Sequence, residues 1–187
     1  RQVDGGSMTY YGGRQLAESF RTVRKNTLTI AEEIPEEKYS FKATPEVMSV
    51  GEILAHLAIN PLWQIDVHSK HVPLIDAAFF TRRMQEAGAQ QAALRTKAEI
   101  VAALREHGER FGAFLDSLDE ATLAEIVSFP PPIQPSTKSR FELLLGAKEH
   151  EMHHRGQLML IQRLIGQVPH LTRARQARQA QAAVARA

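Results

Sequence analysis

Apolar residues recur along most of the chain at intervals of three and four, the spacing that gathers side chains on one face of an α-helix. Four long segments show this pattern, at about 16–34, 50–65, 94–118 and 139–165. The alternation typical of strands is scarce, and only 124–129 is a candidate strand. We therefore predict an all-α protein, a four-helix bundle with a long irregular connection between its third and fourth long helices.

Short signals mark where these helices begin and end. Ser49 with Glu52, and Ser139 with Glu142, have the spacing of a capping box, in which each side chain satisfies a backbone donor at the helix start. Gly166 fits a left-handed cap at the end of the fourth long helix.

The segments between the long helices are expected to belong to one domain, residues 9–170. Residues 73–86 predict a further short helix closed by Gly88, and the proline-rich stretch 119–138 is the irregular connection. We expect residues 1–8 to be a cloning remnant. The Arg/Ala/Gln-rich residues 171–187 are expected to form a helical C-terminal tail.

The composition limits the classes of chemistry and of partner. The 187 residues include no cysteine, which excludes disulfides, thiolate ligands and a cysteine nucleophile. No apolar run approaches the roughly 20 residues of a membrane-spanning helix. The net charge of +2 lies in the tail, because 172–187 hold four arginines and no acid, so the body lacks the basic patch of a nucleic-acid-binding protein. We expect a cytoplasmic protein that binds neither membrane nor nucleic acid.

The fourth long helix carries the most informative pattern, a stripe that is apolar except for three polar members. The stripe consists of Leu143, Ala147, His150, His154, Gln157, Ile161 and Leu164. His150 and His154 lie one turn apart, so both imidazoles can reach one metal ion. Glu151 lies about 100° further around the helix and is expected to face outward.

His56 is the third candidate ligand. It lies on the second long helix among apolar residues and should face the bundle interior. Three histidines from two helices would hold one divalent ion, such as zinc, nickel or iron, and leave open positions for water or substrate. The alternative is that each is a hydrogen-bonded core histidine.

Other polar residues near these histidines have weaker assignments. Asn60 and Gln157 are candidate catalytic residues that could orient water or substrate by hydrogen bonds. His153 falls at the edge of the site, whereas His68 and His71 are expected to be exposed to solvent.

Two stretches, SVGEILAHL at 49–57 and HEMHHRGQLMLIQRLIG at 150–166, resemble the DinB/YfiT-like superfamily of small four-helix-bundle proteins. Their order and spacing are similar to that family over most of residues 14–166. The resemblance implies a divalent metal held by His56, His150 and His154. Members commonly form dimers, and characterised members include thiol-dependent S-transferases, a thiol-dependent isomerase and proteins proposed to be metal hydrolases.

The predicted function is therefore a metal-dependent enzyme acting on a small-molecule substrate, with a low-molecular-weight thiol as a second cofactor. A metal lowers the pKa of a bound thiol and keeps a nucleophile available for S-transfer or isomerisation. Two alternatives stay open: hydrolysis by metal-bound water, and a non-catalytic metal-binding stress protein.

A homodimer is also expected. Phe111, Phe114 and the apolar residues of 73–80 offer more apolar surface than one small core should hide, and exposed patches of this kind mark interfaces.

Overall fold

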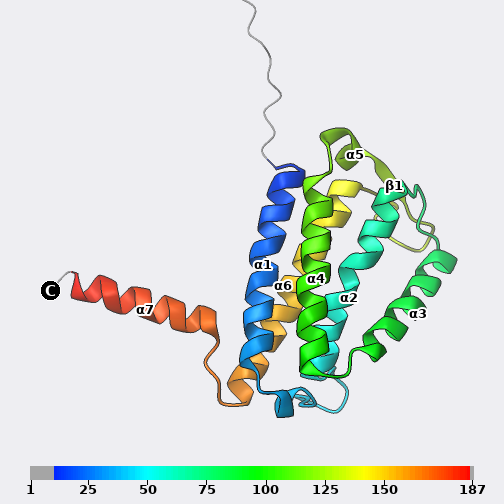
Figure 1. The fold of residues 1–187 in the computed structure, drawn as a ribbon. Helices are drawn as coiled ribbons and strands as arrows, with labels where there is room; N and C mark the ends of the chain where they lie inside the picture. Colours follow the sequence, from blue (N-terminus) through cyan, green and yellow to red (C-terminus); the bar gives the residue numbers. More distant parts are fainter. Residues whose placement is uncertain (1–10, 186–187) are drawn as a thin grey trace, which may run out of the picture.

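The structure is a computed structural model, and it describes residues 11–185. Its helices are α1 (Gly13–Glu33), the 3-10 turn η1 (Glu36–Lys38), α2 (Val50–Ser69), α3 (Ala77–Ala93), α4 (Lys97–Asp116), α5 (Glu120–Ala124), α6 (Arg140–Leu164) and α7 (His170–Val184), with strands β1 (Ile126–Ser128) and β2 (Thr137–Ser139). The prediction of a largely helical bundle is confirmed (Figure 1).

Four long helices, α1, α2, α4 and α6, form the bundle. α1 packs against α4 and α6, and α2 packs against the same two helices, so α1 lies diagonally opposite α2. The chain descends in α1 and α6 and ascends in α2 and α4 in the view of Figure 1. α2 and α6 are therefore antiparallel neighbours, and residues from their facing sides can meet.

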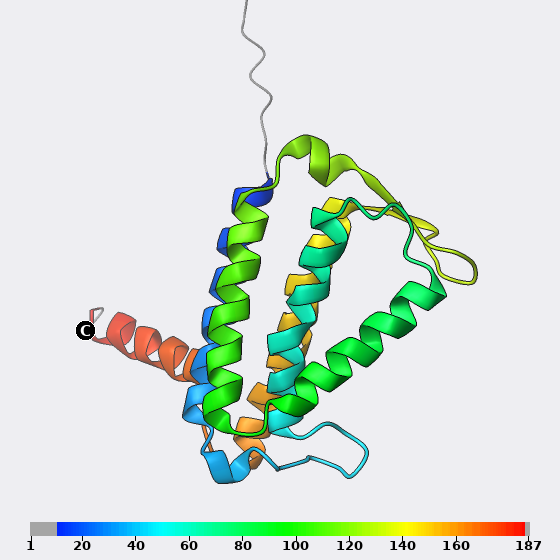
Figure 2. The same cartoon turned by 45° about the vertical axis from the view of Figure 1, so that its right-hand side comes forward.

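α2 and α4 run in the same direction, so the chain must return to the other end of the bundle between them. α3 makes this crossover. It returns the chain along the outer side of α2 before α4 begins (Figure 2). The predicted end at Gly88 is wrong, because the helix continues through Gly88 to Ala93. Gly88 has open space around it, so nothing there requires the helix to stop.

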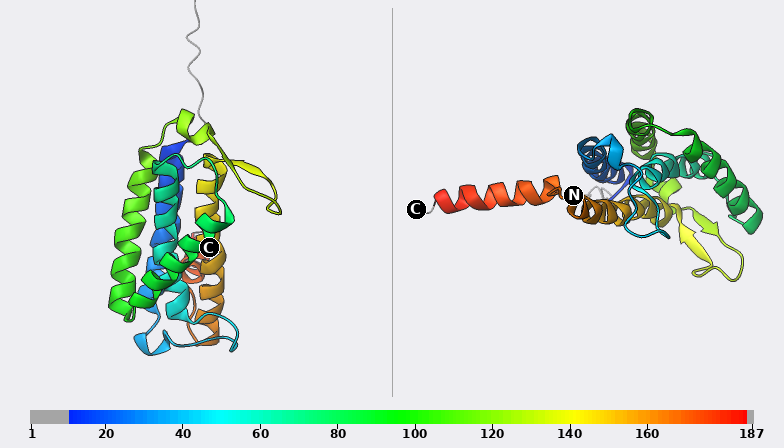
Figure 3. Two further views of the ribbon diagram at one scale, coloured as in Figure 1. Left: turned by 90° about the vertical axis from the view of Figure 1, so that its right-hand side faces the viewer. Right: turned by 90° about the horizontal axis from the view of Figure 1, so that it is seen from below.

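The long connection between α4 and α6 crosses the end of the bundle. It contains α5 and a short antiparallel hairpin in which β1 pairs with β2 over Ile126–Ser128 and Thr137–Ser139 (Figure 3). The candidate strand at 124–129 is confirmed, but its partner β2 was not predicted, since a three-residue strand carries too little pattern to recognise.

The two predicted capping boxes and the predicted cap at Gly166 are confirmed. The hydroxyls of Ser49 and Ser139 accept hydrogen bonds from the backbone N–H groups of Glu52 and Glu142, and each glutamate closes the box by accepting from the serine N–H. Gly166 has φ +85°, the left-handed conformation that glycine adopts most easily.

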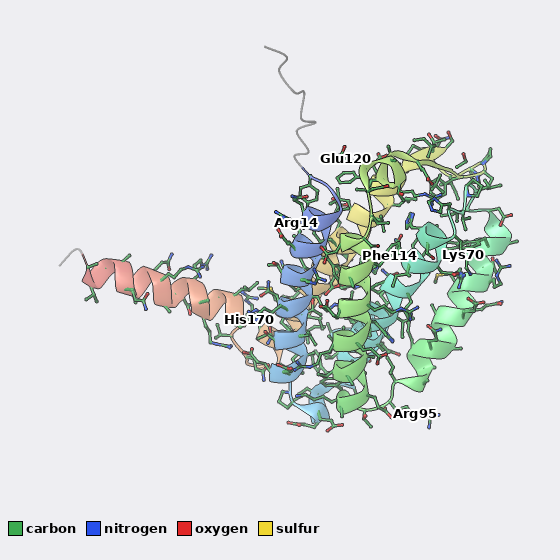
Figure 4. All side chains as sticks on the ribbon, turned by 45° about the horizontal axis from the view of Figure 1, so that its top comes forward. Arg14, Lys70, Arg95, Phe114, Glu120 and His170 are labelled. Carbon is green, nitrogen blue, oxygen red and sulfur yellow. The ribbon has the colours of Figure 1, made fainter. Side chains whose placement is uncertain are left out.

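The tail is helical as expected and leaves the body of the protein at His170 (Figure 4). Among the described residues of α7, those of the first turn hold it to the body: His170 bonds to Asn26, Arg163 donates to Thr172 Oγ1, and Arg173 pairs with Glu33. No residue of α7 is buried among those described. The predicted remnant at 1–8 lies outside the described residues. Within residues 11–185, no helix is both long enough and apolar enough to span a bilayer.

The surface expected to form a dimer interface is partly inside the molecule. Phe111 and Ile75 are buried in the single chain, which corrects their assignment to an exposed patch. Leu74 and Phe80 are exposed, at 47% and 57% of their full area. The homodimer itself stays a prediction.

His68 was predicted to be exposed, and this is wrong: its side chain is completely buried. Arg140 Nη1 donates to His68 Nδ1 (3.2 Å), and His68 Nε2 donates to Gln64 Oε1 (3.0 Å). Arg140 in turn pairs with Glu125, which also accepts from the exposed His71. The pattern failed here because the arginine that makes His68 compatible with burial comes from another helix.

Burial, and then the charge of Arg140, lowers the pKa of His68 from 6.5 to about 4. Between these two values the unfolded chain binds a proton at His68 and the folded chain does not. Stability should therefore fall as the pH falls through this range, by about 2–3 kcal/mol at pH 4.5 relative to pH 7. Urea unfolding of metal-free protein should show this loss, and H68Q should remove that part of the pH dependence. Equal pH dependence in both proteins would contradict the assignment.

Candidate metal centre

Three imidazoles from α2 and α6 converge on one point. His56 Nε2 lies 3.1 Å from His150 Nε2, and His154 Nε2 lies 3.2 Å from the same atom. All three candidate ligand atoms lie within 4.8 Å of one another. The structure therefore brings together the three histidines that the sequence singled out, and no Asp or Glu joins their cluster in the part of the chain described.

These separations fit a divalent ion. Nitrogen ligands at 2.0–2.1 Å that subtend angles between right-angled and tetrahedral lie about 2.8–3.4 Å apart. Three Nε2 lone pairs pointing at one another would repel unless a proton or a cation lay between them. The donor set is neutral imidazole, which zinc, nickel and iron all accept.

Each imidazole is oriented by a carboxamide on its other nitrogen. His154 Nδ1 donates to Gln157 Oε1 (2.8 Å), while the amides of Asn60 and Gln91 lie 3.2 and 3.3 Å from the Nδ1 atoms of His150 and His56. A metal-binding Nε2 requires the hydrogen to sit on Nδ1. Gln157 already accepts such a hydrogen, and a half-turn of the Gln91 amide would present its oxygen to His56. Asn60 Oδ1 accepts from the indole N–H of Trp63, so Asn60 would have to give up that bond to accept from His150.

Two of these carboxamides, Asn60 and Gln157, are the predicted catalytic candidates, a role that stays a prediction, and Gln91 is an addition to the predicted site. Asn60 and Gln157 bond to the imidazoles, so they hold ligands in place. Gln157 also donates to His153 Nε2 (3.2 Å), which places exposed His153 at the edge of the site as expected. Gln91 was missed, because it reaches His56 from α3 and no pattern in the sequence places those two residues together.

Partial burial keeps the cluster neutral. It lowers the pKa values of His56, His150 and His154, neighbouring histidines lower all three further, and the pKa of His150 falls to about 4. Imidazoles that are neutral at physiological pH have their lone pairs available for a metal.

Glu151 does not face outward, which corrects the prediction from the helical stripe. It is 2% exposed and forms a buried ion pair with Arg24 of α1, with two nitrogen–oxygen distances of 2.8 Å. Arg24 also donates to the carbonyl oxygens of Leu57 in α2 and Leu104 in α4.

Arg24 of α1 thus contacts the other three long helices of the bundle. Its partner on α2, Leu57, follows His56 in the sequence, and its partner on α6, Glu151, follows His150. Gly108 of α4 leaves room for it, since a Cβ there would come within 2.9 Å of Arg24 Cγ. This contact fixes the relative register of the two helices that carry the histidines.

The buried face of α6 is centred one residue away from the predicted stripe. Leu144, Glu151 and Leu158 are buried, whereas Gln157 and Leu164 are exposed. A buried glutamate counts as polar in a hydrophobicity pattern, so the pattern placed the centre of the face at His150. The histidines instead lie at the margin of the core, with His56 and His150 partly accessible.

One pocket borders the cluster, and a second lies further along α2. One, of about 210 Å³, lies between α2, α6 and β2 and is lined by Asn60, Trp63, Gln64, Lys138, Glu142, Leu143, Gly146, Ala147 and His150; we call it the Trp63 pocket. A larger one, of about 660 Å³, lies near the start of α2 and reaches Gln91. Asn60 thus lines the pocket beside His150, whereas Gln157 does not.

Comparison with known proteins identifies similar chains. The model of the DinB superfamily matches residues 19–158. The uncharacterized protein YjoA of Bacillus subtilis strain 168 is 25% identical over 152 residues, which cover 81% of this chain and 90% of that protein. The crystal structure of this DinB-like protein YjoA matches with a TM-score of 0.62 and 23% identity over 82% of this chain and 93% of that one.

A second solved structure shares the fold. YfiT from Bacillus subtilis, described as a probable metal-dependent hydrolase with an unusual four-helix bundle topology, matches with a TM-score of 0.65. The match covers 87% of this chain and 92% of YfiT, at 14% identity. At this identity the likeness concerns the fold alone.

Proposed function

The chain belongs to the DinB superfamily, and from that premise we propose that it is a divalent-metal-dependent enzyme that transfers or isomerises a small electrophilic substrate with the help of a low-molecular-weight thiol. The observation that carries the proposal is the convergence of His56, His150 and His154 through their Nε2 atoms. A structural zinc site is closed by four protein ligands, whereas three leave a position for a reactant.

The ion, when bound, would supply Lewis acidity and would lower the pKa of a thiol or a water at the open position. The residues of the chain supply the rest. The three imidazoles would hold the ion without cancelling its charge, and the amides of Gln91, Asn60 and Gln157 fix the ring orientations. The Trp63 pocket adjoins His150 and gives a substrate access to the centre.

The absence of a free carboxylate at the cluster favours a thiol over water. Glu151, adjacent to His150 in sequence, is held by Arg24 and faces the opposite way, and no other acid joins the cluster within residues 11–185. Attack by water benefits from a general base that removes a proton, whereas a thiol that has already lost its proton needs none.

Hydrolysis is the second candidate function, and one observation favours it. YfiT, which shares this fold, is described as a probable metal-dependent hydrolase. A hydrolase of this kind would use the same three histidines but would act without any thiol.

The two candidates separate in one experiment on cobalt-substituted protein. Adding 2-mercaptoethanol should produce a new sulfur-to-cobalt charge-transfer band in the near ultraviolet, and ethylene glycol, its oxygen counterpart, should produce none. Ester cleavage in the absence of thiol, with no such band while cobalt stays bound, would reject the thiol-dependent reaction and favour the hydrolase.

A further inference from the structure

The Trp63 pocket contains a hydrogen-bond donor whose direction is set from deep inside the protein. Gln64 is 4% exposed, yet it lines this pocket. Its Oε1 accepts from His68, whereas its Nε2 makes no hydrogen bond within residues 11–185 and is not among the buried atoms that lack a partner. The amide nitrogen therefore opens to the pocket.

The orientation of that amide follows from a chain of obligatory donors. An arginine can only donate, so the contact from Arg140 makes His68 Nδ1 an acceptor. A neutral imidazole with an acceptor at Nδ1 carries its hydrogen on Nε2, which must then meet the oxygen of Gln64. The NH₂ group of Gln64 is left facing the pocket. Arg140 and His68 are both almost fully buried, so this arrangement is rigid.

A positive charge lies beside this donor. Lys138 of β2 lines the same pocket, and no ion pair joins its ammonium group to a carboxylate in the described part of the chain. Glu142 also lines the pocket, and its Oε2 accepts from Ser139 N (2.7 Å) and Ser139 Oγ (2.8 Å). These hydrogen bonds, and to a smaller degree the charge of Lys138, lower the pKa of Glu142, although the two side chains form no ion pair.

The remaining wall is apolar. Trp63, Leu143 and Ala147 face the pocket, and an added Cβ at Gly146 would meet nothing within 4 Å, so the space beside it is free. The indole nitrogen of Trp63 donates to Asn60 Oδ1 (3.2 Å), which fixes one face of the ring as a wall. His150 completes the lining at the metal centre.

From this juxtaposition we infer that the Trp63 pocket is the substrate subsite and selects small molecules that carry a carboxylate, held by Gln64 Nε2 and Lys138, with their hydrocarbon or aromatic part against Trp63. The inference rests on the proposed function, because it names the substrate class of the same centre. A carboxylate accepts from both donors, and hydrogen bonds to a charged group are the stronger kind. A neutral molecule of the same shape would leave the lysine unpaired.

The test uses Trp63, the single tryptophan of the sequence, as the reporter. Metal-free protein is titrated with 4-nitrobenzoate, whose nitro group quenches indole fluorescence, and with the neutral 4-nitrobenzyl alcohol. We expect the anion to bind at least tenfold more tightly than the alcohol. Because no ion is present, this preference cannot come from a metal–carboxylate bond.

Variants test which residues cause the preference for the anion. Q64E keeps an oxygen acceptor for His68 but replaces the donor with a carboxylate oxygen, and K138M removes the positive charge; both should abolish the preference for the anion. Q85E adds the same negative charge on the exposed face of α3 and should leave the preference unchanged. If Q64E does not fold, as judged by circular dichroism, K138M still decides.

Equal quenching by anion and alcohol, no quenching by either, or a preference that survives in K138M would overturn the inference. Metal binding is measured separately on the same preparations. A chain that prefers the anion but holds no divalent ion would keep the subsite and refute the proposed function. A chain that binds the ion but does not prefer the anion would refute the subsite and leave the proposed function standing.

Discussion

H56A should lose its divalent ion. His56 supplies one of only three ligand atoms in the cluster, and it comes from a different helix from the other two. Removing a residue that merely supports a ligand usually weakens metal affinity 10–100-fold, so loss of a ligand should weaken it by more than roughly a hundredfold. Equilibrium dialysis of purified, tag-free protein against buffered zinc measures this directly.

Thermal unfolding gives a second readout of the same loss. A ligand that binds only the folded state stabilises it, by about 2.7 kcal/mol at a free concentration one hundred times its dissociation constant. Zinc should therefore raise the unfolding temperature of the wild type and leave that of H56A unchanged. H71N is the matched control, since His71 is exposed and bonds to Glu125 rather than to the cluster. A full equivalent of zinc in H56A at the wild-type affinity would refute the three-histidine site.

E151A should lose about 3–5 kcal/mol of unfolding free energy, the usual cost of breaking a buried ion pair. The substitution leaves the Arg24 guanidinium charged and desolvated at the centre of the bundle, where its side chain is only 4% exposed. Chemical denaturation monitored by circular dichroism gives the value. The ligand-bearing helices should also lose their fixed register, so zinc affinity should fall even though no ligand has changed.

The double substitution R24M/E151L tests the mechanism of that loss. It replaces the ion pair with apolar side chains and leaves no unpaired charge, so it should be closer to wild type in stability than either single variant. E109A is a control, because the Arg21–Glu109 pair is on the surface, where such pairs contribute at most about 1 kcal/mol. A cost below 1 kcal/mol for E151A would show that the buried pair does not hold the helices together.

The sequence predicted the parts of this fold that depend on local chemistry. The capping boxes at Ser49 and Ser139 and the left-handed Gly166 are set by residues within a few positions of one another, and all three are present. The three histidines could be singled out because each interrupts an apolar face, and that signal also lies within single helices.

Two of the errors share one physical cause, a polar residue whose burial depends on a partner distant in the chain. Glu151 needs Arg24, and His68 needs Arg140; without knowledge of the partner, each looks like a surface residue. The same limit explains why Gln91 was missed. The crossover by α3 also escaped prediction, because helix direction is decided by packing between helices rather than by the pattern within one.

The central claim is that His56, His150 and His154 together bind one divalent ion that keeps an open position. X-ray absorption at the zinc edge of the loaded protein tests it most directly. We predict one zinc per chain with three imidazole nitrogens at about 2.0–2.1 Å and a further light ligand that 2-mercaptoethanol replaces with sulfur at about 2.3 Å. Two or fewer imidazoles, or a fourth protein ligand that thiol cannot displace, would contradict the claim.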